Sequence, residues 1–159
     1  MADTKKAQGL PGAILFACNF NRVRSPMAEA LLKRLIGDRA FVDSCGVRLD
    51  PRSPTDEGID PFAASVMAEL SCSLSDYQPK TFESLNPDAF DLVVSLTPQA
   101  QQRAKEMTRG RAVEIEYWPL ADPTQSDGSR EARLAVYRQV RDALAERIAL
   151  RFGADYGKG

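Results

Sequence analysis

Residues 13–37, AILFACNFNRVRSPMAEALLKRLIG, contain the pattern that decides the fold of this chain. Residues 13–18 (AILFAC) form a short continuous apolar run, which is typical of a strand buried on both faces of a parallel sheet. A helical pattern follows over residues 25–37, where Pro26 suits the first turn and Gly37 suits the C-terminal cap. A buried strand that leads directly into a helix predicts the first unit of an α/β domain.

The same alternation continues along the rest of the chain. Further strands are predicted at residues 40–47, 91–96 and 112–117, and further helices at 62–70, 98–107 and 129–152, with a turn and a short helix over 75–85. The last helix has the strongest pattern, because apolar residues recur at fourfold spacing: Val136, Val140, Leu144, Ile148 and Phe152. These elements predict one α/β domain over residues 12–153, a four-stranded parallel sheet with helices on both faces, and flexible termini at 1–11 and 154–159.

The composition excludes several classes of protein. The chain has 159 residues, 21 Lys+Arg and 22 Asp+Glu, so it lacks the basic excess that a nucleic-acid-binding protein needs. No apolar run approaches the roughly 20 residues of a membrane helix, and residues 1–12 do not resemble a signal peptide. We therefore expect a cytoplasmic protein with no nucleic-acid or membrane partner, present as a monomer or a weak homodimer.

The chain contains no histidine and three cysteines. Ser-His-Asp triads, Cys-His dyads and HExxH zinc sites are thus excluded. The cysteines, Cys18, Cys45 and Cys72, are an odd number without a CxxC pair, which predicts neither a disulfide framework nor a zinc site. Catalysis would depend on Cys, Asp, Glu, Ser, Thr, Tyr, Lys or Arg.

Ligands of open α/β sheets bind at the carboxyl ends of the strands, which directs attention to the loop after the first strand. Cys18 ends that strand, Arg24 follows in the loop, and a helix begins at Ser25. Backbone N–H groups of a tight loop and the positive end of a helix attract a tetrahedral oxyanion. Arg24 can bind two of its oxygens, and the same positive surroundings favour the nucleophilic thiolate of Cys18.

Two more residues of the loop suit this chemistry. Asn21 could adopt the left-handed conformation of a tight loop, and Ser25 could donate a hydrogen bond to the sulfur of Cys18. The alternative is a buried structural thiol at Cys18 and a surface charge at Arg24; the strand before the loop and the helix after it favour the functional interpretation. The predicted phosphate-binding residues are Asn19, Phe20, Asn21, Arg22, Val23, Arg24 and Ser25.

The segment CNFNRVRSPMAEAL resembles the C-x5-R-[ST] signature of the low-molecular-weight protein tyrosine phosphatases and of the thioredoxin-coupled arsenate reductases that share their fold. The order of elements is similar over residues 12–152, and Asp122 precedes a proline in a loop before the last helix, as in that family. The resemblance implies a flavodoxin-like fold in which Cys18 forms a phosphocysteine and Arg24 binds phosphate oxygens with the loop amides. Asp122 would protonate the leaving group and then activate water; the alternative is a plain turn residue.

The resemblance also bears on cofactors and partners. No metal or organic cofactor is expected, because Arg24 and the loop amides would stabilise the charge that a magnesium ion stabilises in other enzymes. The expected partners are a phosphorylated protein or a small phosphate ester, together with inorganic phosphate or a similar oxyanion.

The chain departs from the family pattern at several positions. Phe20 stands where relatives commonly have Gly, and it could narrow the mouth, stack on a substrate or pack on neighbouring loops. Val23 stands where phosphatases often have a second Cys, so a protective disulfide with Cys18 is not available. Arg22 could draw acidic substrates or lie solvated on the rim. Relatives often place a His near Tyr77 to support the loop Asn, a support that we expect to be absent or altered.

Three functions remain as hypotheses. The first is a phosphatase acting on phosphomonoesters, such as phosphotyrosine or a related aryl or acyl phosphate, although residues 49–55 and 124–125 lack the aromatic side chains that flank phosphotyrosine. The second is an arsenate reductase, which usually needs two more cysteines after the third strand; residues 95–110 contain none, so an external thiol would be required. The third is a non-catalytic phosphate-binding module, which the retention of the nucleophile, the arginine and the aspartate disfavours. Cys45 and Cys72 are expected to be core or incidental residues.

Overall fold

The computed structural model describes residues 9–51 and 58–153. Its four strands form one parallel sheet in the order β2-β1-β3-β4. The strands are β1 (Ala13–Cys18), β2 (Phe41–Gly46), β3 (Leu92–Ser95) and β4 (Glu114–Tyr117). The helices are α2 (Arg24–Ile36), α3 (Pro61–Ala68), α4 (Pro98–Thr108) and α5 (Arg130–Ile148). The predicted four-stranded parallel α/β fold is therefore confirmed.

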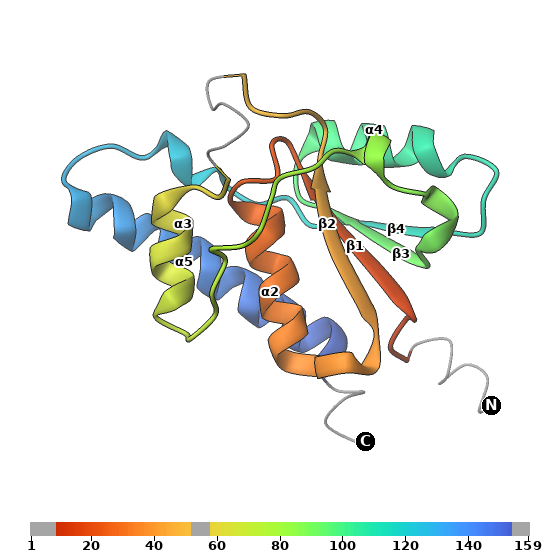
Figure 1. Cartoon of the computed structure of the whole chain (residues 1–159), viewed down its shortest axis with the longest axis horizontal. Helices are drawn as coiled ribbons and strands as arrows, with labels where there is room; N and C mark the ends of the chain where they lie inside the picture. The colour runs from red at the N-terminus through yellow and green to blue at the C-terminus, as the bar shows by residue number, and fades with distance from the viewer. Residues whose placement is uncertain (1–8, 52–57, 154–159) are drawn as a thin grey trace.

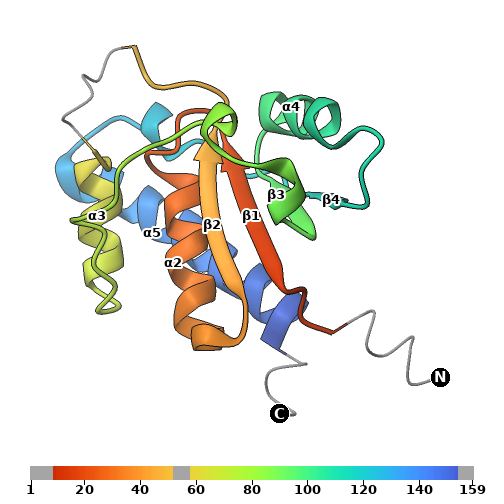
Figure 2. The same cartoon turned by 45° about the vertical axis from the view of Figure 1, so that its right-hand side comes forward.

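The helices cover both faces of the sheet (Figures 1 and 2). Helices α2, α3 and α5 lie on one side and α4 lies on the other. Strand β1 is buried at every position, and its residues alternate between the two sides. Ile14 and Phe16 belong to the larger core cluster, with α2 and α5, whereas Leu15 and Ala17 belong to the smaller one, with α4. Because both faces of β1 are buried, every residue of the strand is apolar, and the strand therefore forms a continuous apolar run in the sequence.

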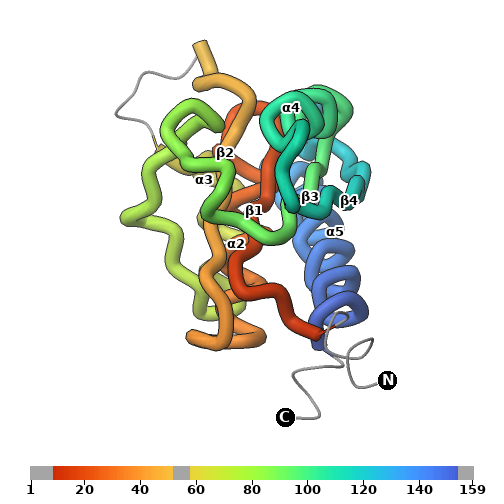
Figure 3. The backbone as a smooth tube through the Cα atoms, turned by 90° about the vertical axis from the view of Figure 1, so that its right-hand side faces the viewer, coloured from red at the N-terminus to blue at the C-terminus, as the bar shows by residue number. Residues whose placement is uncertain are grey.

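The strand order places a switch point beside β1. The chain leaves β1 through α2 to reach β2 on one side, and it later returns to β3 on the other side. Adjacent connections that diverge in this way leave a crevice at the carboxyl ends of the strands. Figure 3 shows the loop after β1 at the same end of the molecule as α4, while the described ends of the chain lie at the opposite end.

Several boundaries differ from the predicted ones. The last α-helix ends at Ile148, and residues Ala149–Gly153 form a π-helical turn. Val136 is only partly buried, because Leu134 and Tyr137 take the positions that face the core. Strand β4 starts at Glu114 rather than at residue 112. Of the termini predicted to be flexible, residues 1–8 and 154–159 lie outside the described residues.

In the described part of the chain, no helix has the length and apolar character needed to cross a bilayer.

Candidate active site

The loop between β1 and α2 turns tightly and leaves several backbone donors without a protein acceptor. Asn21 has a φ of 57°, which confirms the predicted left-handed backbone. Among the described residues, the backbone N–H groups of Asn21, Arg22 and Val23 have no protein acceptor. These donors and the N-terminus of α2, which begins at Arg24, are available to a bound oxyanion.

Cys18 lies buried at the end of β1, in contact with a hydroxyl group. Its sulfur is 3.0 Å from Oγ of Ser25, whose single proton can go either to the sulfur or to the carbonyl oxygen of Cys45 at 3.2 Å. A thiolate competes well for that proton, because a hydrogen bond to an ionised acceptor is the stronger of the two. The geometry thus permits the predicted hydrogen bond from Ser25 to Cys18.

Arg24 joins the nucleophile loop to a segment nearly one hundred residues away in the sequence. Its side chain is 10% exposed, and its Nη1 donates to the carbonyl oxygen of Leu120 at 2.9 Å. Its Nη2 is 3.8 Å from Oδ2 of Asp122. The alternative that Arg24 is a surface charge is therefore wrong, and the structure brings Asp122 next to Arg24.

Asp122 is held by the turn that it begins. It is the N-cap of a short 3₁₀ helix, Pro123–Gln125, and its Oδ1 accepts hydrogen bonds from the backbone N–H and the hydroxyl group of Thr124 at 3.0 and 2.7 Å. Burial raises the pKa of Asp122, but the bonds from Thr124 and the charge of Arg24 outweigh burial and leave the pKa below its ordinary value. At neutral pH Asp122 is thus a carboxylate. It caps a turn, as the turn alternative expected, and it also faces Arg24.

The side chain of Asn21 uses its full hydrogen-bonding capacity. Its Nδ2 donates to Oγ of Ser25 at 2.8 Å and to Oγ of Ser44 at 3.1 Å. Its Oδ1 accepts from the hydroxyl group of Tyr77 at 2.8 Å and from the backbone N–H of Lys80 at 2.9 Å. A left-handed backbone costs a non-glycine residue roughly 1–2 kcal/mol, and these four bonds offset that cost. The support expected to be absent or altered at Tyr77 is thus altered, with a phenol as the donor.

The hydrogen bonds around Tyr77 extend to charged groups. Burial raises the pKa of Tyr77 to about 12, so its hydroxyl stays protonated at neutral pH and can donate to Asn21. Nζ of Lys80 lies 3.2 Å from that hydroxyl and 2.8 Å from Oδ1 of Asp43. The sequence did not predict the roles of Ser44 and Lys80. The one available sign was Ser44, a serine inside the apolar pattern of β2, because a buried hydroxyl group needs hydrogen-bond partners.

The neighbouring strands supply two further contacts to the loop. At Gly46, which ends β2, an added Cβ would lie 2.8 Å from backbone atoms of Asn19, Phe20 and Asn21, so only glycine fits there. After β3, the hydroxyl of Thr97 donates to Oδ1 of Asn19 at 2.7 Å and also accepts from the first turn of α4. The loop is therefore held from both neighbouring strands.

The comparisons with known proteins identify the family. The family model described as low molecular weight phosphotyrosine protein phosphatase matches residues 13–152. The chain belongs to this family. An arsenate reductase from Bacillus licheniformis is 33% identical over 138 residues, which cover 85% of this chain and 91% of that protein.

Among the solved structures with a similar fold are a phosphatase and an arsenate reductase. A mutant of the YwlE arginine phosphatase with a phosphorylated active site serine has a TM-score of 0.68 and 25% identity, covering 86% of this chain and 90% of that chain. An arsenate reductase in the phosphate binding state has a TM-score of 0.66 and 26% identity, covering 92% of this chain and 97% of that chain. Both kinds of chemistry are therefore found on this fold.

Arg22 does not lie solvated on the rim of this phosphatase-family loop, so that alternative is wrong. Its Nε donates to the carbonyl oxygen of Gly58 at 2.9 Å, and its Nη1 is 3.7 Å from Oδ2 of Asp50. Its own carbonyl oxygen accepts from the backbone N–H of Asp60 at 3.1 Å. Both side chains of the ion pair are largely buried. Arg22 thus ties the nucleophile loop to Asp50, Gly58 and Asp60.

Phe20 and Val23 pack against protein. The guanidinium carbon of Arg48 lies 5.2 Å from the centroid of the Phe20 ring, which matches the expected alternative of packing on a neighbouring loop. Val23 is 7% exposed and belongs to the larger core cluster.

The other cysteines are placed in or against the core, as predicted. Cys45 is fully buried, and its pairing with Ala17 puts its side chain on the sheet face opposite to that of Cys18. Burial, with the nearby negative groups, raises the pKa of Cys45 well above its usual value. Cys72 packs against the larger core cluster. All three thiols are free. Within residues 9–51 and 58–153, no three or more Cys, Asp or Glu side chains are grouped as a metal site requires.

Proposed function

We propose that this chain hydrolyses phosphate monoesters through a phosphocysteine formed on Cys18. The observation that carries this proposal is the position of Arg24, which lies in the nucleophile loop and within 3.8 Å of the carboxylate of Asp122. A phosphoryl group held by Arg24 would have a sulfur nucleophile on one side and an acid on the other. That is the arrangement needed for an in-line displacement.

In the first step, the thiolate of Cys18 attacks phosphorus, and the bond from phosphorus to the ester oxygen breaks. The loop N–H groups and the Nε and Nη2 groups of Arg24 would stabilise the equatorial oxygens, while Nη1 remains on the Leu120 carbonyl. The leaving oxygen takes a proton from Asp122. Because Asp122 is ionised in the free protein, the incoming phosphate dianion must raise its pKa so that it gains the proton.

In the second step, water attacks the phosphocysteine. Asp122, now a carboxylate again, accepts the proton of the water, and the bond between phosphorus and sulfur breaks. The hydroxyl of Ser25, 3.0 Å from the sulfur, would stabilise the departing thiolate of Cys18. Inorganic phosphate is released, and no redox change occurs.

The proposed substrates are aryl or acyl phosphates, with phosphotyrosine as the reference case, on a protein or a small ester. The proposed compartment is the cytoplasm, which keeps the catalytic thiol reduced. A second candidate is arsenate reduction, which the names of the curated relatives favour. The placement of Cys45 on the other face of the sheet disfavours it, because reduction needs a second thiol that can reach Cys18.

One set of assays tests the proposal. The chain should hydrolyse p-nitrophenyl phosphate with inhibition by vanadate, and Cys18→Ser should abolish turnover while phosphate still binds. Asp122→Ala should lower kcat by about 10²-fold, and more for phenyl phosphate, whose leaving group needs the proton more. Arsenate-dependent consumption of thiols without phosphatase activity would instead support the second candidate. Binding of phosphate with turnover of neither substrate would contradict both.

A further inference from the structure

Arg48 follows β2 and is attached to the nucleophile loop through its backbone. Its N–H donates to the carbonyl oxygen of Asn19 at 3.1 Å, and the N–H of Val47 donates to the carbonyl oxygen of Cys18 at 3.0 Å. Asn19 is the residue directly after the nucleophile. The side chain of Arg48 therefore starts beside the loop, and it is exposed to solvent.

The guanidinium of Arg48 is held against the same loop. Its central carbon lies 5.2 Å from the centroid of the Phe20 ring, which is within the range of a cation–π contact. Phe20 is half-buried and follows Cys18 by two residues, and two residues span at most about 7 Å of chain. The contact with the ring therefore keeps the positive charge of Arg48 close to the phosphate-binding site.

The donors of this guanidinium are not used within the described residues. Over residues 9–51 and 58–153, Arg48 makes no ion pair and no side-chain hydrogen bond. The carboxylate nearest to it in the sequence, Asp50, lies 3.7 Å from Nη1 of Arg22 instead. A guanidinium has five N–H donors in a planar fork, and the fork fits two oxygens of one carboxylate or phosphate group.

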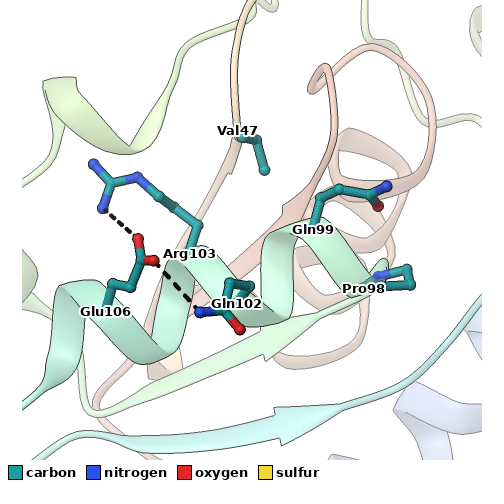
Figure 4. Close-up of a pocket in the computed structure, with 6 residues that line it drawn as sticks. All are labelled: Val47, Pro98, Gln99, Gln102, Arg103 and Glu106. Atoms are coloured by element: carbon teal, nitrogen blue, oxygen red, sulfur yellow. Dashed lines mark hydrogen bonds and ion pairs between the residues drawn. The ribbon is translucent and has the colours of Figure 1, made fainter.

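Arg103 on α4 shows the opposite arrangement. Its guanidinium carbon also lies near a ring, 5.7 Å from the centroid of Phe82. However, Glu83 and Glu106 compensate its charge, with N to O distances of 2.8 and 3.9 Å. Figure 4 shows the pair of Arg103 with Glu106. A compensated guanidinium attracts a further anion weakly, whereas the charge of Arg48 can still pair with one.

The alternative role of Arg48 is to cover the ring of Phe20. Apolar contact would be enough for that role, and an unbranched side chain such as methionine would supply it. The charge and the fork of donors would then have no effect on which ester the loop accepts. The two roles therefore differ in whether the charge of Arg48 changes the choice of substrate.

The geometry points to Arg48 as the residue that binds a second anionic group of the substrate. This role rests on the proposed function and narrows it: the preferred phosphate ester carries a carboxylate or a second phosphate a few bonds away from the phosphoryl group that is removed. The phosphoryl group binds to Arg24 and the loop, and the second anion accepts hydrogen bonds from the guanidinium of Arg48. Either anion offers two oxygens to the fork of donors.

The test uses aryl phosphates that differ in one group. 4-Carboxyphenyl phosphate carries a carboxylate, 1,4-phenylene bisphosphate carries a second phosphate, and 4-carbamoylphenyl phosphate is the neutral counterpart. We expect Arg48→Met to lower kcat/KM for the charged esters about tenfold relative to the neutral one, mainly through KM. Tenfold corresponds to about 1.4 kcal/mol, which is close to the lower end for a hydrogen bond to a charged group. A loss confined to one charged ester would identify that anion as the second group.

The controls separate the charge of Arg48 from its packing. Arg103→Met is the matched control, since it removes a guanidinium that lies near a ring but is already paired, and it should leave the relative kcat/KM values within twofold. Arg48→Lys keeps the charge and loses the fork, so it should retain part of the preference. An equal loss for charged and neutral esters in Arg48→Met would overturn the proposed role, because Arg48 would then only support Phe20. Unchanged relative values would overturn it as well.

A binding measurement separates the role of Arg48 from the proposed function. With the Cys18→Ser variant, isothermal titration calorimetry should show that a charged ester binds about tenfold more tightly than 4-carbamoylphenyl phosphate, and Arg48→Met in the same background should remove the difference. Equal affinities, with all three esters hydrolysed by the wild-type protein, would overturn the role of Arg48 and still support a phosphatase. A wild-type protein that hydrolyses none of them, with the tenfold preference present in Cys18→Ser, would contradict the proposed function and support anion binding by Arg48.

Discussion

Replacement of Tyr77 by phenylalanine tests whether the buried network positions the nucleophile loop. The change removes one hydroxyl group and keeps the ring. Asn21 loses the 2.8 Å bond to its Oδ1 but keeps the 2.9 Å bond from the backbone N–H of Lys80. Ser44 and Lys80 lose one partner each and retain others, namely Glu29 and Asp43. The variant should therefore fold.

The expected magnitude follows from these contacts. A net hydrogen bond contributes about 0.5–1.5 kcal/mol, and the hydroxyl group serves several partners, so the free energy of unfolding should fall by about 1–3 kcal/mol. The lost bond to Asn21 should reduce the stabilisation of the loop conformation by about 1 kcal/mol. If all of this free energy is lost from transition-state binding, kcat/KM falls about fivefold. Asn21→Ala removes all four bonds and retains the left-handed strain, so its effect should be several times larger.

The assay is the pH dependence of p-nitrophenyl phosphate hydrolysis together with urea unfolding. The pKa of Tyr77 is about 12, so its hydroxyl keeps its proton throughout the usual assay range and adds no limb to the wild-type profile. Tyr77→Phe should lower the profile without changing its shape. Tyr77→His should add a limb, because an imidazole titrates near 6.5 and its protonated form is disfavoured beside Lys80.

Thr108→Val is the control, since it removes a buried hydroxyl that donates to the carbonyl oxygen of Ala104 at 2.8 Å, at the C-terminal end of α4. It should cost stability but leave kcat/KM within twofold. The reasoning would be refuted if Tyr77→Phe lost stability with unchanged kcat/KM, or if both variants lost activity equally. Either result would mean that Tyr77 supports the fold in general and not the loop.

Three other substitutions test the segments around the loop and the surface of the domain. Arg22→Ala should lower the free energy of unfolding by about 1–3 kcal/mol, because it removes a charged hydrogen bond to Gly58; Arg22→Lys should recover only part of this in urea unfolding. Thr97→Val should cost about 1 kcal/mol as a lost N-cap and, by freeing Asn19, should also raise KM for p-nitrophenyl phosphate. Hydrogen bonds from two arginines lower the pKa of Glu69 to about 2, so its stabilising effect is complete above about pH 4.5 and is lost as the pH falls toward 2. Glu69→Gln should therefore narrow the difference between unfolding midpoints at pH 7 and pH 3, and an unchanged difference would contradict the assigned pairing.

The sequence predicted those features that depend on local pattern. Strand β1 was visible because a strand buried on both faces is apolar at every position. The left-handed Asn21 was visible because few residues tolerate that conformation and a tight loop requires it. The neighbourhood of Arg24 and Asp122 was not visible from spacing. Its expectation came from the family resemblance, and the structure brings the two side chains within 3.8 Å.

The features that were missed depend on contacts between distant segments. Nothing near Arg22 in the sequence indicates that Gly58 will accept its hydrogen bond, since the two residues are 36 positions apart and meet only in the folded chain. The end of the last helix was also misplaced. Its apolar spacing continues to Phe152, which is fully buried, although the backbone hydrogen bonds change to a π-helical turn after Ile148. Side-chain periodicity reports burial, and it does not report which carbonyl oxygen accepts each N–H.

The choice between the two chemistries of this family depends on electrons as well as on geometry. Hydrolysis of a phosphocysteine needs only water and a base, and the base that we propose, Asp122, lies 3.8 Å from Arg24. Release of arsenite from an arsenate adduct on Cys18 needs two electrons, which a second thiol supplies by attacking the Cys18 sulfur. Cys45 cannot take that role while β1 and β2 stay paired, because Ala17 and Cys45 are register partners and their side chains lie on the face that Cys18 does not share. Cys45 therefore does not supply the second thiol of a reductase built on this chain, whereas a phosphatase needs no second thiol.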